Sequence, residues 1–430
     1  MAANPEPESP SACDRLMEEV CERENLKQAL KRVKANKGAP GVDGMTVQAL
    51  PAYLREHWPS IRETLLSGTY KPQPVRRVEI PKPDGGGVRK LGIPSALDRL
   101  VQQAVLQVLQ RQWDPTFSDS SYGFRPGRSA HQAVARAQGY IQAGHGWVVD
   151  LDLAQFFDRV NHDILMSRVA SRISDRRLLK LIRAFLTAGV LENGLVGATE
   201  EGTPQGGPLS PLLSNLMLDD LDRLLEQRGL RFVRYADDCN VYVRSERAGQ
   251  RVMAGLKAFL TSKLKLKVNE AKSAVARPHT RKFLGFTFLN RVQTKRRIAP
   301  KALHRFKERV RALTQRSRGV SGDQMIGALK RYLTGWRGYF GFCETPSVLT
   351  QLDEWIRRRL RCFFWRQWKR GRTRFRELVA RGVNQNLAAQ TAGSPHGVWR
   401  LSNSPALSKA LSNRYFRSLG LPSLGPSPIN

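Results

Sequence analysis

The sequence predicts an α+β fold followed by an all-α region, and three observations support this. First, 41% of the 430 residues are hydrophobic and 8% are aromatic, which is typical of a globular protein rather than a disordered basic tail. Second, short β-branched runs alternate with helical patterns up to about residue 290. Third, the periodicity beyond that point is helical alone. At roughly 100 to 200 residues per domain, the length fits about two to four domains.

The N-terminal third alternates helix and turn. Leu16, Val20 and Leu26 belong to a helical pattern that begins near Cys13 and precedes the Gly-rich turn 38–44. A strand is expected at 75–80, and the Pro- and Gly-rich turn 81–87 returns the chain into a second strand at 88–93. These two strands form a basic hairpin. A long helix with an apolar stripe is expected over 96–113.

Two strand-like segments in the centre contain carboxylates. The run 147–153 is β-branched and apolar except for Asp150 and Asp152, which a period of two places on one face. Between 231 and 243, two apolar runs flank Asp237 and Asp238, which predicts a β-hairpin with two acids at its tip.

The composition changes near residue 290. Residues 291–380 contain 24 Lys and Arg against 6 Asp and Glu, so more than half of the net charge lies in about a fifth of the chain. We expect an all-α domain here, with its tryptophans mainly in the core, and a frayed tail over the last dozen residues. The tryptophans are Trp336, Trp355, Trp365 and Trp368.

The overall charge limits the kinds of partner. The chain has 71 Lys and Arg against 37 Asp and Glu, a net charge of +34 and an isoelectric point near 10.8. Such a field attracts phosphates first and anionic membrane surfaces second. The first 14 residues have no apolar core, and no window of about 18 apolar residues predicts a transmembrane helix. We therefore expect a soluble intracellular protein.

The cysteines indicate a reducing compartment. Their number is odd, their spacings are scattered, and they contain no Cys-x-x-Cys pair that would suggest zinc. We expect most of them to be buried as small hydrophobic residues. They are Cys13, Cys21, Cys239, Cys343 and Cys362.

The carboxylates on apolar strands need an explanation in so basic a chain, because a buried carboxylate is costly unless it is paired or bound to a metal. Each could pair with a nearby arginine such as Arg159 or Arg234. Convergent carboxylates are also the usual ligands of Mg²⁺, and a pair of such ions assists phosphoryl transfer. An acidic cluster on a basic chain therefore suggests a nucleotide polymerase or a nuclease.

Ordered motifs make the chain resemble the reverse transcriptases encoded by bacterial group II introns. The two acidic segments resemble the paired active-site blocks of reverse transcriptases, and further blocks follow the same order from about residue 14 to 376. In chain order they are Gly38–Gly44, Ile80–Pro83, Leu91–Pro94, Tyr122–Pro126, Asp152–Asp158, Gly202–Pro211, Tyr235–Asp238, Leu266–Ser273 and Phe283–Phe286.

The resemblance implies the chemistry of the acids. Asp152, Asp237 and Asp238 match the catalytic carboxylates, and these three positions together with Leu153 match the sites that bind two Mg²⁺ ions, for which Mn²⁺ is a possible substitute. Asp150 matches a position that needs no acid, and its role stays open.

The resemblance also implies a nucleotide pocket. Lys82 and Arg89 would neutralise the incoming triphosphate, Gln205 and the following glycines would line the pocket, and Lys272 would either protonate pyrophosphate or only bind phosphate. Phe156 resembles the steric gate against a ribose 2′-hydroxyl, with core packing as the alternative; for Phe157 we expect core packing.

The implied architecture is a right-hand polymerase. We expect an N-terminal extension over 1–45, fingers and palm over 46–290, an α-helical thumb or maturase domain over 291–376, and a DNA-binding segment with a flexible tail over 377–430. Nucleic-acid contacts are expected from the basic face of the helical domain. The candidate residues are Arg337, Arg357, Arg358 and Arg361.

The resemblance implies an RNA-directed DNA polymerase that also assists intron splicing and mobility in the bacterial cytoplasm, in association with the nucleoid. Its partners would be an RNA template and DNA primer, deoxynucleoside triphosphates, group II intron RNA and target DNA, and its oligomeric state stays open. Two alternatives are a splicing factor with a vestigial polymerase site and a domesticated enzyme of DNA repair or phage defence. No cysteine follows Cys362, so we expect no endonuclease module and no second-strand cleavage.

Overall fold

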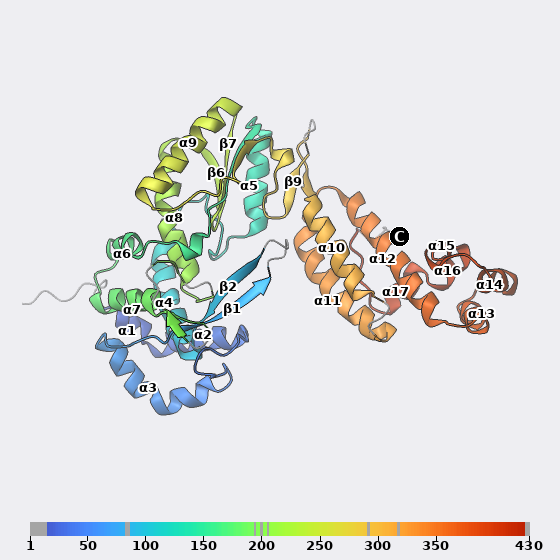
Figure 1. Ribbon diagram of the computed structural model, residues 1–430, viewed down its shortest axis with the longest axis horizontal. Helices are drawn as coiled ribbons and strands as arrows, with labels where there is room; N and C mark the ends of the chain where they lie inside the picture. The colour runs from blue at the N-terminus through green and yellow to red at the C-terminus, as the bar shows by residue number, and fades with distance from the viewer. Residues whose placement is uncertain are drawn as a thin grey trace, which may run out of the picture. The chain divides into compact units, whose positions relative to one another are not determined.

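The computed structural model describes residues 15–81, 87–192, 195–197, 201–203, 206–289, 293–315 and 319–425. The chain divides into two compact units, Met1–Arg277 and Pro278–Asn430 (Figure 1). Unit 1 contains helices and two four-stranded sheets, whereas unit 2 is mainly helical. This arrangement confirms the predicted fold class. Of the helices in the described ranges, none is long and apolar enough to cross a membrane.

The N-terminal helices belong to the core of unit 1. The helix expected from Cys13 is broken into α1 (Leu16–Val20) and α2 (Arg23–Ala35), because Glu22 is extended and precedes α2 as its N-cap. Both helices contact α4 (Ala96–Trp113), whose predicted bounds are confirmed. The side-chain amide of Asn25 in α2 donates to the carbonyl oxygen of Ala104 in α4 at 3.2 Å. The expected N-terminal extension is therefore part of the same core.

The first sheet contains the predicted basic hairpin. Strands β1 (Val75–Pro81) and β2 (Val88–Ile93) pair antiparallel, as the turn between them predicted. β1 also pairs in parallel with β4 (Val190–Glu192), which continues into β5 (Leu195–Gly197). The strand order is β2-β1-β4-β5.

The second sheet contains the two acidic segments. Its strand order is β6-β7-β3-β8, and all three pairings are antiparallel. Helices α5 and α9 pack on this sheet (Figure 1). The strands are β3 (Trp147–Leu151), β6 (Arg231–Tyr235), β7 (Asp238–Val243) and β8 (Ala274–Ala276).

Most other helices of unit 1 begin at a side chain that caps them. Ser129 caps α5 through a reciprocal capping box, and Asn161, Asp175 and Ser245 cap α6, α7 and α9. These four helices therefore begin directly after a Ser, Asn or Asp whose side chain accepts a hydrogen bond from the first turn. The remaining helices are α3 (Leu50–Leu66), α5 (Ala130–Gln142), α6 (His162–Ala170), α7 (Arg176–Thr187), α8 (Ser210–Gln227) and α9 (Glu246–Lys263).

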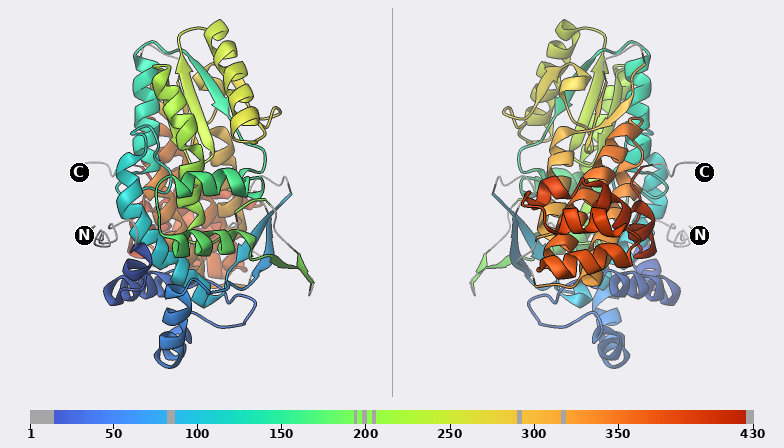
Figure 2. Two further views of the ribbon diagram at one scale, coloured as in Figure 1. Left: turned by 90° about the vertical axis from the view of Figure 1, so that its left-hand side faces the viewer. Right: turned by 90° about the vertical axis from the view of Figure 1, so that its right-hand side faces the viewer.

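Unit 2 is a helical bundle preceded by a short hairpin (Figure 2). The hairpin pairs β9 (Phe286–Phe288) with β10 (Arg296–Ile298). Trp336, Trp365 and Trp368 are buried in one core, as expected, and Trp355 packs against it. The helices are α10 (Pro300–Leu313), α11 (Gly322–Phe340), α12 (Pro346–Gln367), α13 (Gly371–Ala380), α14 (Gln385–Ala392), α15 (Val398–Leu401), α16 (Pro405–Ala410) and α17 (Asn413–Ser418).

Unit 2 extends further in both directions than composition indicated. At its start, the Tyr339 hydroxyl donates to the carbonyl oxygen of Leu284 at 2.7 Å and Phe286 packs on Phe340, so the hairpin belongs with the helices. At its end, the core continues through Leu424, so the segment expected over 377–430 is not separate from the helical domain up to that point.

The expected frayed tail is wrong as far as Gly425. The buried carboxylate of Asp353 accepts hydrogen bonds from the Ser423 hydroxyl and from the backbone N–H groups of Leu424 and Gly425. A buried carboxylate needs such donors, and here the tail supplies them. This constraint holds a Pro- and Gly-rich segment that local propensity alone leaves loose.

Candidate active site

The three predicted catalytic acids lie at one end of the β3–β7 strand pair. Tyr235 pairs with Asp238 across the β6–β7 hairpin, and the turn between them places Ala236 at φ +57°. Leu151 is opposite Cys239, so Asp152, the next residue after β3, comes out at the same end as Asp238. The structure therefore brings Asp152, Asp237 and Asp238 together, as the motifs predicted.

A neighbouring segment fixes the position of Asp152. The backbone N–H of Asp152 donates to the Ser273 hydroxyl at 3.0 Å, and the N–H of Asn269 donates to the carbonyl oxygen of Asp152 at 2.8 Å. Leu153 forms an isolated antiparallel bridge with Val268. The Nζ of Lys272 lies 3.7 Å from the carboxylate of Asp152. The predicted lysine is thus beside the predicted acid.

The carboxylates affect one another. The pKa of Asp237 is raised, mainly by burial and further by the charge of Asp152. Its own backbone N–H and the charges of Arg89 and Arg234 act in the opposite direction. Arg89, which is exposed on β2, therefore acts electrostatically on the turn that contains Asp237. Two carboxylates that repel each other in a half-buried site are stabilised by a cation.

The donor chemistry at this site fits a divalent cation. Carboxylate oxygens are the ligands that Mg²⁺ prefers, and the mutual repulsion of Asp152 and Asp237 favours such an ion. Within the described residues, no three carboxylate, histidine or cysteine side chains are gathered closely enough to form a ready-made metal site. The described acids lie at one end of the sheet, but their side chains are not close enough together to form a complete set of metal ligands.

The two arginines considered as partners of these acids have other contacts. The guanidinium of Arg234 is paired with Asp222 in α8, and Arg159 donates to the side chain of Gln155 at 3.4 Å. Asp150 is buried in the middle of the sheet, opposite Asn240 and Ala274, and so lies inside the strand rather than at its end.

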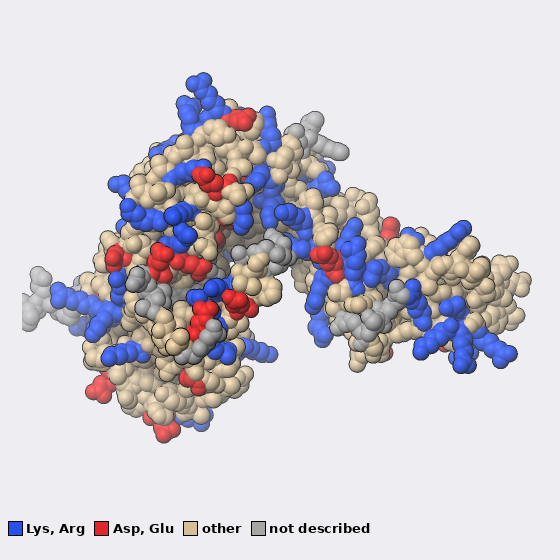
Figure 3. Space-filling model, viewed as in Figure 1, with Lys and Arg blue, Asp and Glu red and all other residues tan. Residues whose placement is uncertain are grey.

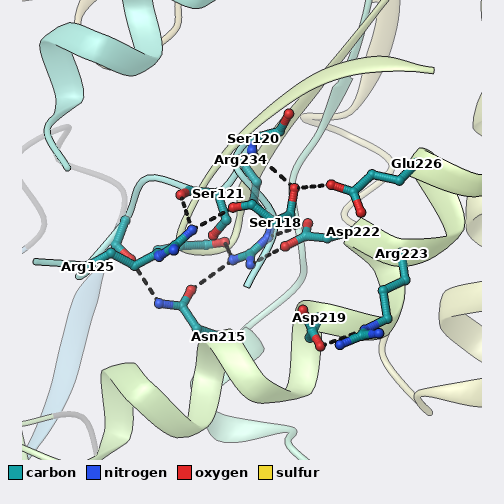
Figure 4. Close-up of polar contacts among 12 residues, drawn as sticks. Ser118, Ser120, Ser121, Arg125, Asn215, Asp219, Asp222, Arg223, Glu226 and Arg234 are labelled. Carbon is teal, nitrogen blue, oxygen red and sulfur yellow. Dashed lines mark hydrogen bonds and ion pairs between the residues drawn. The ribbon is translucent and has the colours of Figure 1, made fainter. Parts of the chain in front are cut away.

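A buried polar network supports the turn that contains Asp237 (Figure 4). Arg234 and Asp222 are both fully buried, and Arg234 Nε donates to Asp222 Oδ1 at 2.7 Å. Arg234 Nη1 also donates to the carbonyl oxygen of Ala236 and to Asn215 Oδ1, each at 3.0 Å. The only sequence indication was an arginine and an aspartate inside otherwise apolar patterns.

The network continues to a loop that touches the turn. The side-chain amide of Asn215 donates to the carbonyl oxygen of Gly123 at 2.9 Å. A Cβ at Gly123 would lie 2.3 Å from the backbone nitrogen of Ala236, a distance that real Cβ atoms do not show. Only glycine permits this approach, which explains one residue of the 122–126 motif.

The predicted nucleotide pocket is partly within the described residues. Phe156 is only 2% exposed and packs edge-on against Phe157 at 5.2 Å between ring centroids. Phe157 is half-buried, so the expected difference in packing between the two rings is reversed. Lys82 and Gln205 lie outside the described residues.

The paired glycines serve contacts between protein segments. Gly206 has φ +134°, and a Cβ there would lie 2.6 Å from the carbonyl oxygen of Gly92 in β2. A Cβ at Gly207 would lie 2.4 Å from the side-chain oxygen of Gln102 in α4. These glycines were expected to line the nucleotide pocket, and in the structure they approach β2 and α4.

Family comparisons agree with this geometry. Residues 80–288 match the model of the reverse transcriptase (RNA-dependent DNA polymerase) family, and residues 303–382 match the group II intron, maturase-specific domain. Protein YkfC of Escherichia coli (strain K12) is 36% identical over 315 residues, which cover 64% of this chain and 81% of YkfC. The chain belongs to the group II intron reverse transcriptases.

Other relatives share less of their length with this reverse transcriptase. The group II intron-encoded protein LtrA of Lactococcus lactis subsp. cremoris is 39% identical over 206 residues, 48% of this chain and 34% of LtrA. The chain thus matches about a third of LtrA. Among solved structures, the partial Cas6-RT-Cas1–Cas2 complex has a TM-score of 0.38 at 25% identity, covering 57% of this chain and 42% of that one.

Unit 2 of the reverse transcriptase contains a groove of about 770 Å³ lined partly by predicted RNA-contacting arginines. Arg357 lies 3.7 Å from Asp353, and Arg361 Nε donates to the carbonyl oxygen of Leu411 at 3.2 Å. The guanidinium of Arg358 stacks 4.0 Å from the ring centroid of Trp399, which is half-exposed. Arg358 and Arg361 therefore hold the C-terminal helices as well as line the groove.

The groove is positively charged. Burial lowers the pKa of Arg361, and the neighbouring charge of Arg357 lowers it further. Arg417 adds a further exposed cation to the lining, while Asp353 is engaged by the tail. Figure 3 shows Lys and Arg side chains over the visible face of unit 2. Arg337 is exposed on a different helix, α11.

The contact of Gly123 with the turn leads to a prediction. We expect Gly123→Ala to lower the rate of primer extension by about tenfold or more, because the added methyl group displaces Ala236 and the adjacent Asp237, and small misplacements in an active site cost up to about 100-fold. Steady-state kinetics on an RNA template with a DNA primer measures the change.

Gly139→Ala is the matched control. Gly139 lies within α5, and a Cβ there would meet no atom within 4 Å. We expect this variant to extend primers at the wild-type rate. Equal rates for Gly123→Ala and Gly139→Ala would contradict the proposed contact.

Proposed function

We propose that the protein is an RNA-directed DNA polymerase that extends a DNA primer on an RNA template and also binds a group II intron RNA, assisting its splicing and mobility at target DNA in the bacterial cytoplasm. The observation that supports this most directly is the arrival of Asp152, Asp237 and Asp238 at one end of a buried sheet. An acidic site on a chain with net charge +34 suits chemistry on polyphosphates.

Divalent ions would bind at this acidic end. Reverse transcriptases use divalent metal ions, and we propose two Mg²⁺, replaceable by Mn²⁺, held by Asp152, Asp237, Asp238 and Leu153. Leu153 has an apolar side chain, so its part falls to the backbone carbonyl. Such ions supply activation of the attacking hydroxyl and stabilisation of the leaving pyrophosphate.

The basic side chains around the acids would bind the nucleotide. The charge of Arg89 lowers the pKa of Asp237. Arg89 would therefore meet the phosphates of a nucleotide bound at this site. Lys82 would join it in binding the phosphates, and Gln205 would contact the nucleotide. Lys272, beside Asp152, would bind or protonate pyrophosphate.

Loss of one carboxylate tests the site. We expect Asp237→Asn to lower primer extension by about 100-fold or more, because metal stabilisation of the reacting phosphates contributes several kcal/mol. Extension of a labelled primer on an RNA template is measured with Mg²⁺ and with Mn²⁺. Asp158→Asn, which alters an exposed carboxylate on the segment that follows Asp152, is the control. Equal extension by the wild type and Asp237→Asn would refute the assignment.

The two adjacent phenylalanines make the steric-gate role testable. We expect Phe156→Ala to raise incorporation of ribonucleotides relative to deoxyribonucleotides by at least about tenfold if its ring excludes the 2′-hydroxyl. The ratio of kcat/KM values for matched nucleotides measures the discrimination.

Phe157→Ala is the comparison, because Phe157 is the more exposed ring. Phe156→Ala also leaves a cavity that costs about 3 to 5 kcal/mol, so thermal unfolding of both variants is recorded. A change in discrimination confined to Phe157→Ala would transfer the gate to that residue. Unchanged discrimination in both variants would remove the role.

The groove in unit 2 supports the RNA-binding part of the proposal. We expect RNA affinity to fall steeply with salt, and the double variant Arg357→Gln/Arg417→Gln to reduce the slope of log K against log[salt] by about 0.7 per lost phosphate contact. Fluorescence anisotropy with intron RNA measures the slope.

Lys31→Gln/Lys34→Gln removes the same charge from the exposed side of α2 and serves as the control. Equal slopes for the two double variants would show that the groove has no special part in binding. A flat salt response of the wild type would count against electrostatic RNA binding altogether.

A further inference from the structure

Phe124 combines two unfavourable features. Its backbone has φ +59°, a left-handed conformation that a bulky L-residue rarely adopts. Its side chain is 49% exposed, so an aromatic ring is left in contact with water. Strained backbone that persists in a fold is most often found at functional sites. Neither feature helps the core, and a glycine or asparagine would satisfy the backbone better.

The residues on both sides of Phe124 hold it in this conformation. Gly123 is fixed by the hydrogen bond from Asn215 and by its contact with Ala236. On the other side, the buried guanidinium of Arg125 donates from Nε to Asp114 Oδ1 at 2.9 Å and from Nη1 to the carbonyl oxygen of Ser121 at 3.0 Å. Figure 4 shows Asn215 and Arg125 in the same group of polar contacts.

Phe124 lies beside the catalytic hairpin. The centroid of its ring is 6.3 Å from that of Tyr235, the residue that pairs with Asp238. In primer extension the 3′-hydroxyl must reach Asp237 and Asp238, so the end of the primer–template duplex has to come close to this ring. Exposed aromatic rings bind bases and sugars through stacking that does not depend on sequence.

We propose that Phe124 packs against the terminal base pair of the primer–template duplex and positions the primer end at the catalytic acids. The inference rests on the proposed polymerase function. The clamp formed by Arg125 and Asn215 keeps the ring in place before the duplex arrives, so binding does not have to order it. The strain at residue 124 is then explained as the cost of presenting an aromatic ring at this point.

The test uses a variant in which stability and function move in opposite directions. Phe124→Gly removes the strain and the ring together, so we expect its Tm to rise while its Kd for an RNA–DNA duplex with a recessed 3′ end increases by about tenfold, the range of one lost base–aromatic contact. Phe124→Tyr should keep the wild-type Kd. The KM for deoxynucleotides should be unchanged in both variants.

Two controls separate the contact from general effects. Lys37→Gly also replaces an exposed residue of positive φ, +46°, and should raise Tm without a tenfold loss of duplex affinity. Single-stranded RNA of the same length should bind the wild type and Phe124→Gly equally.

Three outcomes would overturn the proposal. A lower Tm with unchanged duplex affinity in Phe124→Gly would make the residue structural. A raised KM for deoxynucleotides with unchanged duplex affinity would make it a nucleotide contact instead. Equal loss of affinity for duplex and single-stranded RNA would mean that the ring does not recognise a duplex end. If the wild type itself neither binds nor extends the duplex, the polymerase function fails rather than this inference.

Discussion

The candidate active site depends on the buried ion pair between Arg234 and Asp222. Arg234 immediately precedes Tyr235, and its guanidinium connects α8, through Asp222 and Asn215, with the carbonyl oxygen of Ala236 in the turn. Removing one partner of a buried pair costs about 3 to 5 kcal/mol because the other charge stays buried. The ion pair therefore acts mainly as a constraint on the turn, because the hydrogen bonds of Arg234 to Asp222, Asn215 and Ala236 are all made in one position of the turn.

Four segments far apart in the sequence meet around this constraint. The β3–β7 pairing places Asp152 beside Asp238, and Ser273 in the 267–273 segment accepts a hydrogen bond from the backbone of Asp152. Gly123, in the loop before α5, contacts the turn at Ala236. Each contact is made by a backbone group or by a buried side chain with little freedom. Such preorganisation is what an active site needs in order to bind reacting phosphates without rearranging.

Unit 2 uses its basic residues in two ways. Arg358 and Arg361 donate to groups in or next to the short C-terminal helices, so they fasten the end of the chain to α12. The same residues line a positively charged groove with Trp399 at its edge. A guanidinium has five N–H donors, so one arginine can satisfy a carbonyl group and still offer donors to a phosphate.

The fold class, the basic hairpin and the helix over 96–113 could be predicted from the sequence, because each follows from local periodicity or from a contiguous motif. A contiguous motif also singled out the acids as candidates. The sequence did not determine that Phe156 is buried, that the N-terminal helices share the core of unit 1, or that the tail is held by Asp353. The sequence also did not predict that Arg234 pairs with Asp222. These features depend on which side chains meet across long separations in the chain, and only the packed tertiary structure decides which buried charge finds a partner and which ring stays exposed.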